Sequence, residues 1–188
     1  MNEPLQQGEP AAVHDIITIA SPVGDVHLRP ERDADAEFRF RLFCDSRLPE
    51  WYQVQFAPGM REKLMQHQFH AQTHSYRLQF PAARFDIIEM NGEPIGRIVV
   101  NRPGTMVHIV DQAIVPPLRN RGIGTAIMQA LMEEARQANL PVRLKVGSST
   151  DPSLRLYLRL GFEPIETQPA YIELEWRAPT RTVGASAF

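Results

Sequence analysis

The feature that most constrains this chain is a long, mostly apolar segment that runs directly into a glycine-rich segment of helical spacing. Residues 106–115 are the apolar segment, and after two prolines the run Arg119–Thr125 reads RNRGIGT. From Ile123 to Ala138 apolar residues recur three or four positions apart, as in an amphipathic helix. We therefore expect a central strand at Met106–Val115, followed by a turn and a helix.

The start of that helix has the properties of an anion-binding site. The first backbone amides of a helix have no partner inside the helix and face outward with the positive end of its dipole. Gly122 and Gly124 carry no Cβ, so an anion can approach the backbone closely. Arg119 and Arg121 add positive charge in a chain whose formal net charge is −2. The pattern predicts a site for a phosphate-bearing ligand; a glycine pair that only shapes the turn is the alternative.

Two common nucleotide-binding patterns do not fit this run. A P-loop ends in Gly-Lys-Ser/Thr, and no such ending follows Gly124. A dinucleotide fingerprint has a third glycine and follows the first strand of its sheet, whereas this run lies in the middle of the chain. The 20 Lys and Arg against 22 Asp and Glu provide no general basic field for nucleic acid or anionic lipid. We therefore expect no nucleic-acid or membrane partner.

The remaining patterns predict a mixed α/β sheet with helices on both faces, in the order β-α-α-β-β-β-α-β-α-β. The dipeptide Asn91-Gly92 is a strong signal for a hairpin between two of the strands. Strands are expected at residues 26–29, 85–90, 95–100, 106–115, 142–146 and 171–176. Helices are expected at residues 33–45, 58–80, 123–140 and 151–160.

Length and composition indicate one domain of 188 residues, since 43% hydrophobic and 22% charged residues are typical of a globular chain. We expect an N-terminal tail over residues 1–22 with a short extra strand, a single domain over 23–177 and a C-terminal tail over 178–188. No apolar run reaches the length of a membrane-spanning helix, and the acidic first twenty residues do not form a signal peptide. The single cysteine, Cys44, suits a reducing compartment as a structural thiol, so the expected localisation is cytoplasmic.

Two motifs of the chain resemble the GNAT superfamily of N-acetyltransferases. The family signature between its fourth strand and third helix is Arg/Gln-x-x-Gly-x-Gly/Ala, and Arg119, Gly122 and Gly124 match it. A second family run, Asn-Pro-Ala-x-x-Leu-Tyr-x-x-x-Gly-Phe, is matched by residues 151–162, with aspartate for asparagine and serine for alanine. The order of the elements agrees as well, so the resemblance covers about residues 25–177.

The resemblance implies that acetyl-CoA is the co-substrate and that its acetyl group passes to a primary amine by direct attack. The outer end of the central strand would splay from its neighbour, so that its free amides hold the pantetheine arm and polarise the thioester carbonyl. Asp151 replaces an asparagine that helps hold pantetheine in relatives, and a carboxylate there accepts hydrogen bonds without donating them. No metal is implied. The implied cofactor-binding residues are Gln112, Ala113, Ile114, Arg119, Asn120, Arg121, Gly122, Ile123, Gly124, Thr125 and Asp151.

The resemblance also implies a proton donor and a base. Tyr157 occupies the acid position of the family, and a phenol keeps its proton at pH 7; a ring that only packs in the core is the alternative. Some relatives place a glutamate base six residues before Ile114, where this chain has His108. A structural histidine, a water relay, Asp111 and Glu89 are the alternatives. Regular strand alternation predicts Asp111 on the face opposite His108.

The sequence leaves the acceptor amine open, because aminoglycosides, polyamines, amino acids, peptide N-termini and protein lysines all fit. A non-catalytic acyl-CoA-binding or regulatory module with the same fold is the alternative from another functional class. We expect His67, His70 and His74, on one face of the second helix, to line the acceptor cleft rather than to bind a metal. An exposed final strand at Tyr171–Trp176 would permit a homodimer.

Overall fold

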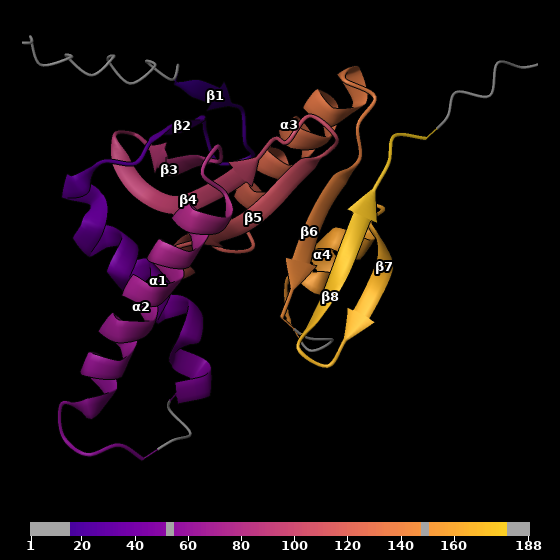
Figure 1. The fold of residues 1–188 in the computed structure, drawn as a ribbon. Coiled ribbons are helices and arrows are strands. Elements are labelled where there is room, and N and C mark those ends of the chain that lie inside the picture. Colours follow the sequence, from indigo (N-terminus) through magenta and orange to yellow (C-terminus); the bar gives the residue numbers. More distant parts are fainter. Residues whose placement is uncertain (1–15, 52–54, 148–150, 180–188) are drawn as a thin grey trace, which may run out of the picture.

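The computed structural model describes residues 16–51, 55–147 and 151–179, and it is built around one mixed sheet of eight strands. The spatial order of the strands is β1-β2-β3-β4-β5-β6-β8-β7 (Figure 1). Neighbouring strands are antiparallel except β5 and β6, which are parallel. The strands are β1 (Ile17–Ile19), β2 (Val26–Pro30), β3 (Arg84–Met90), β4 (Glu93–Asn101), β5 (Val107–Ile114), β6 (Val142–Val146), β7 (Glu163–Gln168) and β8 (Tyr171–Trp176).

Helices cover both faces of this sheet, as the sequence predicts. On one face α1 contacts β4 and β5, and α2 packs beside α1, while on the other face α3 contacts β1, β5 and β6 (Figure 1). The helices are α1 (Ala36–Trp51), α2 (Met60–Gln79), α3 (Ile123–Gln137) and α4 (Leu154–Arg159), with short 3₁₀ turns η1 (Asp33–Asp35) and η2 (Pro116–Leu118). The predicted mixed α/β fold is therefore confirmed.

The larger hydrophobic core lies between the sheet and α3. The apolar residues of α3 are buried at intervals of three or four, so one side of the helix faces strand residues such as Ile98 and Ile109. Complete burial of a side chain such as Ile127 stabilises the fold by about 1.5–3 kcal/mol relative to exposure. A smaller cluster of Phe43, Met65 and Phe69 joins α1 to α2. The periodicity that predicts α3 is thus the periodicity of its buried side.

The β3–β4 hairpin forms at the predicted dipeptide. Asn91 and Gly92 form the turn, with positive φ angles of 54° and 81°, and the residues on either side of it, Met90 and Glu93, are paired across the two strands. Two consecutive positive φ angles match the right-handed twist of the flanking strands, which explains why Asn-Gly is favoured there. The hairpin fixes the register of the central strands that carry the site.

The sequence prediction of the last strand as an exposed edge was wrong. β8 lies between β6 and β7, so β7 forms that edge of the sheet. The sequence gives no signal for β7, because all six of its residues are exposed and no apolar alternation marks it. A homodimer through an exposed β8 edge is therefore not available.

Element boundaries also differ from the expectations. η1 begins the first helical region, which continues as α1 to Trp51, and α4 starts at Leu154 rather than at residue 151. The short extra strand expected within residues 1–22 is present as β1, which pairs with β2. The rest of the two expected tails, residues 1–15 and 180–188, lies outside the described residues. Among the described helices none is long and apolar enough to cross a membrane.

Candidate active site

The two parallel strands at the centre of the sheet separate along their length. β5 pairs with β6 at Val107–Val142, His108–Arg143 and Ile109–Leu144, and the pairing then stops although β5 continues to Ile114. The strands diverge toward their carboxyl ends (Figure 1). The predicted segment Gln112-Ala113-Ile114 lies in the diverging half, where its β6 side has no strand partner among the described strands. Backbone groups there that have no partner within the chain can bind an extended ligand.

The start of α3 lies next to the end of β5. Gly122 is the N-cap with a φ of 86°, and Asn120 has a φ of 60°, so the turn uses two left-handed residues. A Cβ on Gly122 would lie 2.8 Å from Cγ of Pro22, in the turn between β1 and β2. Glycine is therefore required here both for backbone conformation and for space. The contact with Pro22 has no sequence signal, because the two residues are a hundred positions apart.

The helix start and the diverging strand form one continuous surface. An ideal Cβ on Gly124 would lie 3.6 Å from Cδ1 of Ile114 and 3.8 Å from Nε2 of Gln112. The Gln112 Nε2 group is buried and has no hydrogen-bond partner among the described residues. The amides of Ile123, Gly124 and Thr125 belong to the first turn of α3 and have no partner within the helix. The structure thus brings the predicted loop and strand residues together.

The two arginines of the loop differ in their surroundings. Arg119 donates a hydrogen bond from Nε to the carbonyl oxygen of Ile114 at 2.7 Å, which ties the loop to the end of β5. Arg119, Asn120 and Arg121 are all exposed, so the difference between the arginines is this hydrogen bond. The sequence predicts two mobile positive charges beside a phosphate. In the structure Arg119 also links the loop to the end of β5 through its hydrogen bond to Ile114.

Tyr157 lies on α4 with 8% of its surface exposed. Its ring packs edge-to-face on Phe162, with centroids 5.8 Å apart. Burial, assisted by the negative charge of Asp151, raises the pKa of the Tyr157 phenol to about 12. The group is therefore protonated throughout the physiological range, as a proton donor must be.

Asp151 has a local structural role that the sequence comparison does not reveal. Its Oδ1 accepts hydrogen bonds from the backbone N–H of Ser153 at 2.8 Å and from the Ser153 hydroxyl at 2.6 Å. This arrangement closes the turn that leads into α4. One oxygen of the expected pantetheine-binding carboxylate is therefore engaged within the chain.

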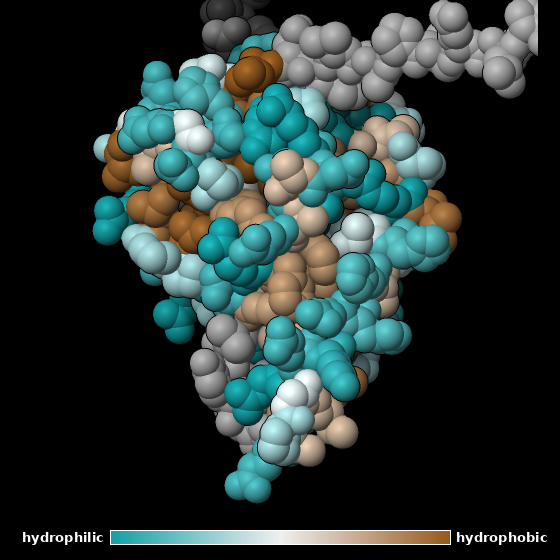
Figure 2. All heavy atoms as spheres, turned by 90° about the vertical axis from the view of Figure 1, so that its left-hand side faces the viewer, coloured by the Kyte–Doolittle hydropathy of each residue, from teal (hydrophilic) through white to brown (hydrophobic). Residues whose placement is uncertain are grey.

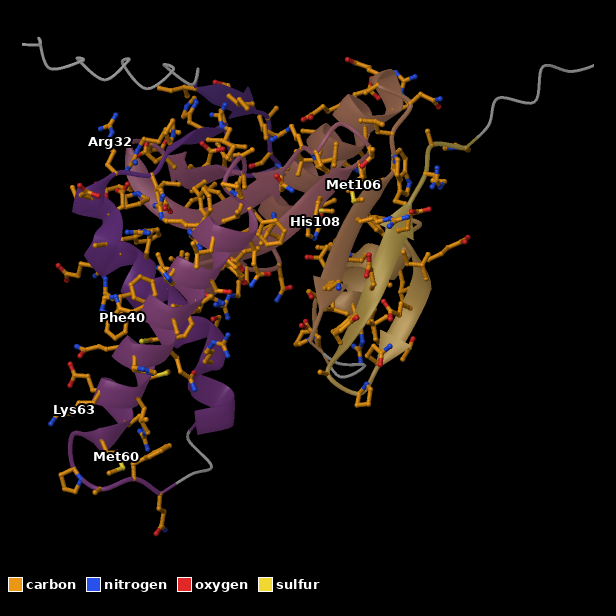
Figure 3. The ribbon with its side chains drawn as sticks, in the orientation of Figure 1. Arg32, Phe40, Met60, Lys63, Met106 and His108 are labelled. Atoms are coloured by element: carbon orange, nitrogen blue, oxygen red, sulfur yellow. The ribbon has the colours of Figure 1, made fainter. Side chains whose placement is uncertain are left out.

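A β-bulge in β5 overturns the prediction that Asp111 and His108 lie on opposite faces. Val99 pairs with Asp111, but the next residue, Val100, pairs with Ile109, so one residue of β5 is skipped. The skipped residue reverses the alternation, and both side chains then point toward the α1–α2 side. The His108 ring packs on Phe80, which follows α2, with centroids 5.3 Å apart. Figure 3 labels His108 on β5.

The pKa values of these two neighbours shift in opposite directions from their ordinary values. Burial lowers the pKa of His108, so the ring is neutral at pH 7. Burial raises the pKa of Asp111, although Arg97 opposes this through an ion pair of 3.2 Å. A neutral imidazole and a half-buried carboxyl group thus lie on the same side of one strand.

A cavity of about 90 Å³ lies between α1, α2 and the sheet, next to Asp111. Its walls include Arg39, Phe69 and Arg97, and it reaches Gln112 and Ala113 on the diverging half of β5. The sequence analysis missed both arginines. Arg97, a charged residue in an otherwise apolar stretch of β4, is the one signal that marks this cavity in the sequence.

The three histidines of α2 do not line this cavity. His67, His70 and His74 are exposed and are not among its lining residues, and their place in the acceptor cleft stays a prediction. Seen from the α1–α2 side, the surface is mainly hydrophilic with a band of hydrophobic side chains across it (Figure 2). No group of three or more potential metal ligands occurs within residues 16–51, 55–147 and 151–179.

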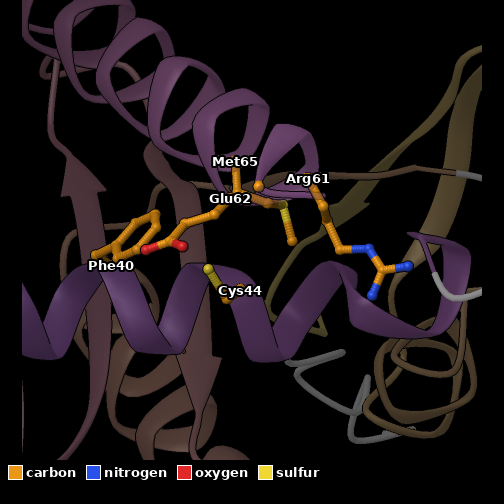
Figure 4. A pocket seen from close by; sticks show the side chains of 6 residues that line it. Phe40, Cys44, Arg61, Glu62 and Met65 are labelled. Atoms are coloured by element: carbon orange, nitrogen blue, oxygen red, sulfur yellow. The ribbon is translucent and has the colours of Figure 1, made fainter. Parts of the chain in front are cut away.

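A second, wider cavity of about 310 Å³ lies between α1 and the start of α2, and Cys44 is in its wall (Figure 4). Phe40 and Met65 provide apolar walls beside the thiol. Burial raises the pKa of Cys44, which makes the thiol a weaker nucleophile at neutral pH. Cys44 is partly rather than fully buried, and its environment fits a structural thiol.

Comparison with known proteins places these features in a family. The model of the acetyltransferase (GNAT) family matches residues 44–162. The chain is 31% identical over 103 residues to an N-alpha-acetyltransferase of Sulfurisphaera tokodaii, which covers 47% of this chain and 62% of that protein. It is 29% identical over 98 residues to an uncharacterised N-acetyltransferase of Methanocaldococcus jannaschii, and this match covers 48% of this chain and 43% of that protein. The matches thus span less than two thirds of each of these relatives.

Solved structures share the fold at low sequence identity. The PaiA N-acetyltransferase of Thermoplasma acidophilum, solved in complex with coenzyme A, aligns with a TM-score of 0.61 and 16% identity, over 81% of this chain and 99% of that one. Ard1 of Thermoplasma volcanium aligns with a TM-score of 0.55 and 21% identity, over 81% of this chain and 96% of that one. The fold agrees with these structures, and the family model matches more than half of the sequence, so the chain belongs to the acetyltransferase (GNAT) family.

Proposed function

We propose that this protein transfers the acetyl group of acetyl-CoA to a primary amine by direct attack, with both substrates bound at once. The observation that carries the proposal is the divergence of β5 from β6 beyond Ile109, with the start of α3 beside the free strand end. Membership of the family and the N-acetyltransferase names of its relatives support the same reaction.

The backbone provides most of the cofactor site in this proposal. The amides from Arg121 to Thr125 would hold the pyrophosphate, because an anion is stabilised at the positive end of a helix. The diverging strand segment 112–114 would pair with the pantetheine arm and donate a hydrogen bond to the thioester oxygen. Acetyl-CoA supplies the activated acyl group, and the protein supplies position and polarisation.

Proton transfer would use side chains on both sides of the thioester. The amine attacks the carbonyl carbon, so a C–N bond forms, the C–S bond breaks and the amine loses a proton. His108, neutral at pH 7, accepts that proton directly or through water, while Asp111 on the same face orients the amine. Tyr157 gives its proton to the departing thiolate.

A thiol-release assay tests this proposal against the alternative of a non-catalytic acyl-CoA-binding module. The protein is incubated with acetyl-CoA and a panel of amines, and free thiol is followed together with the acetylated product. Amine-dependent thiol release above the rate without protein supports the enzyme. Calorimetric binding of CoA without thiol release from any amine would support the module instead.

A further inference from the structure

The cavity beside Asp111 is lined by buried charges of both signs. The side chains of Arg39 and Arg97 keep only 10% and 7% of their surface exposed, while that of Asp111 keeps 28%. Charged groups are rarely buried this deeply without partners, because desolvation is costly. The carboxylate is thus the more accessible charge, and the two guanidinium groups lie deeper.

The positive charges outnumber the negative ones in this network. Glu31 accepts hydrogen bonds from Arg39, Arg77 and Arg97, and Arg97 also donates to Asp111 at 3.2 Å. Among the charged side chains that line the cavity itself, two are positive, Arg39 and Arg97, and one is negative, Asp111, so the lining carries one positive charge in excess. An anionic or strongly electronegative group inside the cavity would balance that excess.

Two of the guanidinium nitrogens also lack hydrogen-bond acceptors. Nη2 of Arg97 and Nε of Arg39 are buried and have no partner within the described part of the chain. An unsatisfied buried donor costs about 1–3 kcal/mol, and more when it is charged. Both arginines line the cavity, so an oxygen atom that enters it lies beside guanidinium groups that are not fully paired within the described residues, which favours a ligand that carries such an oxygen.

The thioester end of the cavity offers the opposite chemistry. Asp111 lies beside Gln112 and Ala113, where the proposed function positions the acetyl group. An amine near Asp111 would face the thioester while an oxygen on the neighbouring carbon reached toward the arginines. The small volume of about 90 Å³ suits such a compact headgroup better than a polyamine or an aminoglycoside.

We infer that the acceptor is an α-amine, that is, an amine whose adjacent carbon carries a carboxylate or carbonyl oxygen. The inference rests on the proposed acetyl transfer and names its substrate class. Free α-amino acids and peptide N-termini share this chemistry. A peptide α-amine has a pKa of about 7.7–8.0, whereas that of a lysine side chain is about 10.4, so a larger fraction of a peptide α-amine is neutral and able to attack at pH 7.

Product binding tests the cavity without requiring turnover. CoA-loaded protein is titrated calorimetrically with N-acetylalanine and with N-ethylacetamide, which differ only in the carboxylate. We expect N-acetylalanine to bind at least tenfold more tightly, about 1.4 kcal/mol. Equal affinities would overturn the inference. An N-acetylated alanine dipeptide in the same titration distinguishes the two sources, because a peptide-terminus site binds it at least as tightly as N-acetylalanine.

Turnover with matched acceptors separates this inference from the proposed function. Alanine, an alanine dipeptide, ethylamine, a polyamine and a lysine with a blocked α-amine are compared by kcat/KM. We expect the better α-amine to exceed ethylamine at least tenfold. Preference for the polyamine or the lysine side chain overturns the inference and leaves acetyl transfer intact. Selective binding of N-acetylalanine without any turnover would refute the proposed reaction and leave the cavity as a binding site for this group only.

A pair of variants tests whether the buried arginine acts on the ligand. Arg39→Gln removes a charge that lines the cavity, whereas Arg77→Gln removes an arginine that also binds Glu31 but is 54% exposed and does not line the cavity. We expect Arg39→Gln to reduce the preference for N-acetylalanine at least tenfold and Arg77→Gln to leave it within twofold. Equal effects of the two variants would refute direct recognition. Arg39→Lys, which keeps the charge, should restore part of the preference.

Discussion

The two sides of the proposed site are built from different parts of the chain. On the cofactor side, the diverging half of β5 and the start of α3 present backbone groups within one short segment, Gln112–Thr125. On the acceptor side, side chains from α1, α2, β4 and β5 surround a small cavity that contains buried ion pairs. A backbone site needs a conformation that many sequences can provide, whereas a side-chain site depends on the identity of each residue.

This difference predicts how each side responds to substitution. On the cofactor side the sensitive positions are those where an amide must be free or a Cβ has no room, as at Gly122. On the acceptor side, removal of one charge leaves another charge buried without its partner, which is strongly destabilising when neither is exposed. The variants below test that distinction, from the largest expected effect to the smallest.

Tyr157→Phe tests the residue proposed to act between the two sides. The substitution removes the hydroxyl and keeps the ring that packs on Phe162. We expect kcat and kcat/KM to fall together by about 10²–10⁴, with CoA affinity and Tm nearly unchanged. Because the pKa of the phenol is about 12, its deprotonation should not limit the wild-type rate at any pH below about 10.

Tyr171→Phe is the matched control, since this hydroxyl donates to Glu166 at the far edge of the sheet. Its rate should equal that of the wild type. A Tyr157→Phe rate within about threefold of wild type would mean that water protonates the thiolate and that Tyr157 is not the proton donor.

His108→Gln tests the acceptor side through its pH dependence. The lowered pKa of His108 predicts that kcat/KM is lost as pH falls through a value below 6.5, because protonation removes the base. The same shift means that His108 stabilises the fold less as pH falls, since the unfolded chain then binds more protons. We expect His108→Gln to lower kcat/KM by about 10² at pH 7.5 and to abolish this acidic limb. Persistence of the limb would transfer the role of base to Asp111.

Gly124→Pro tests whether the cofactor side binds through its backbone. Proline has no backbone N–H, so the substitution removes one free amide from the first turn of α3 and distorts the start of the helix. We expect CoA affinity to fall at least tenfold, about 1.4 kcal/mol, in calorimetry. Gly124→Ala keeps the amide, and its Cβ would make only ordinary contacts with Ile114 and Gln112, so it is the control. Similar affinities for the two variants would show that this amide is not used.

Arg121→Ala and Arg119→Ala separate charge from loop geometry on the cofactor side. We expect Arg121→Ala to weaken CoA binding about threefold at low salt and hardly at all at high salt, because an exposed charge is screened. Arg119→Ala also breaks the hydrogen bond to the Ile114 carbonyl, so part of its loss should persist at high salt. Identical salt dependence of the two variants would assign Arg119 a purely electrostatic role.

The sequence alone determined the local parts of this protein. The strand, turn and helix from Met106 onward, and the hairpin at Asn91-Gly92, follow from periodicity and turn chemistry within windows of about twenty residues. The first family motif falls within these local elements, which explains why the local geometry of the proposed cofactor side could be predicted from the sequence. Roles of individual residues there remain predictions for the variants above.

Only the tertiary structure decided the acceptor side. The pairing of β4 with β5 sets the bulge that brings Asp111 to the face of His108, and no pattern within β5 announces it. Arg97 donates a hydrogen bond to Glu31, which lies 66 positions away in the sequence. β7 forms the edge of the sheet, and its six exposed residues show no apolar pattern that would predict a strand. Contacts of this kind depend on how distant segments pack together, and single-segment patterns carry no information about that packing.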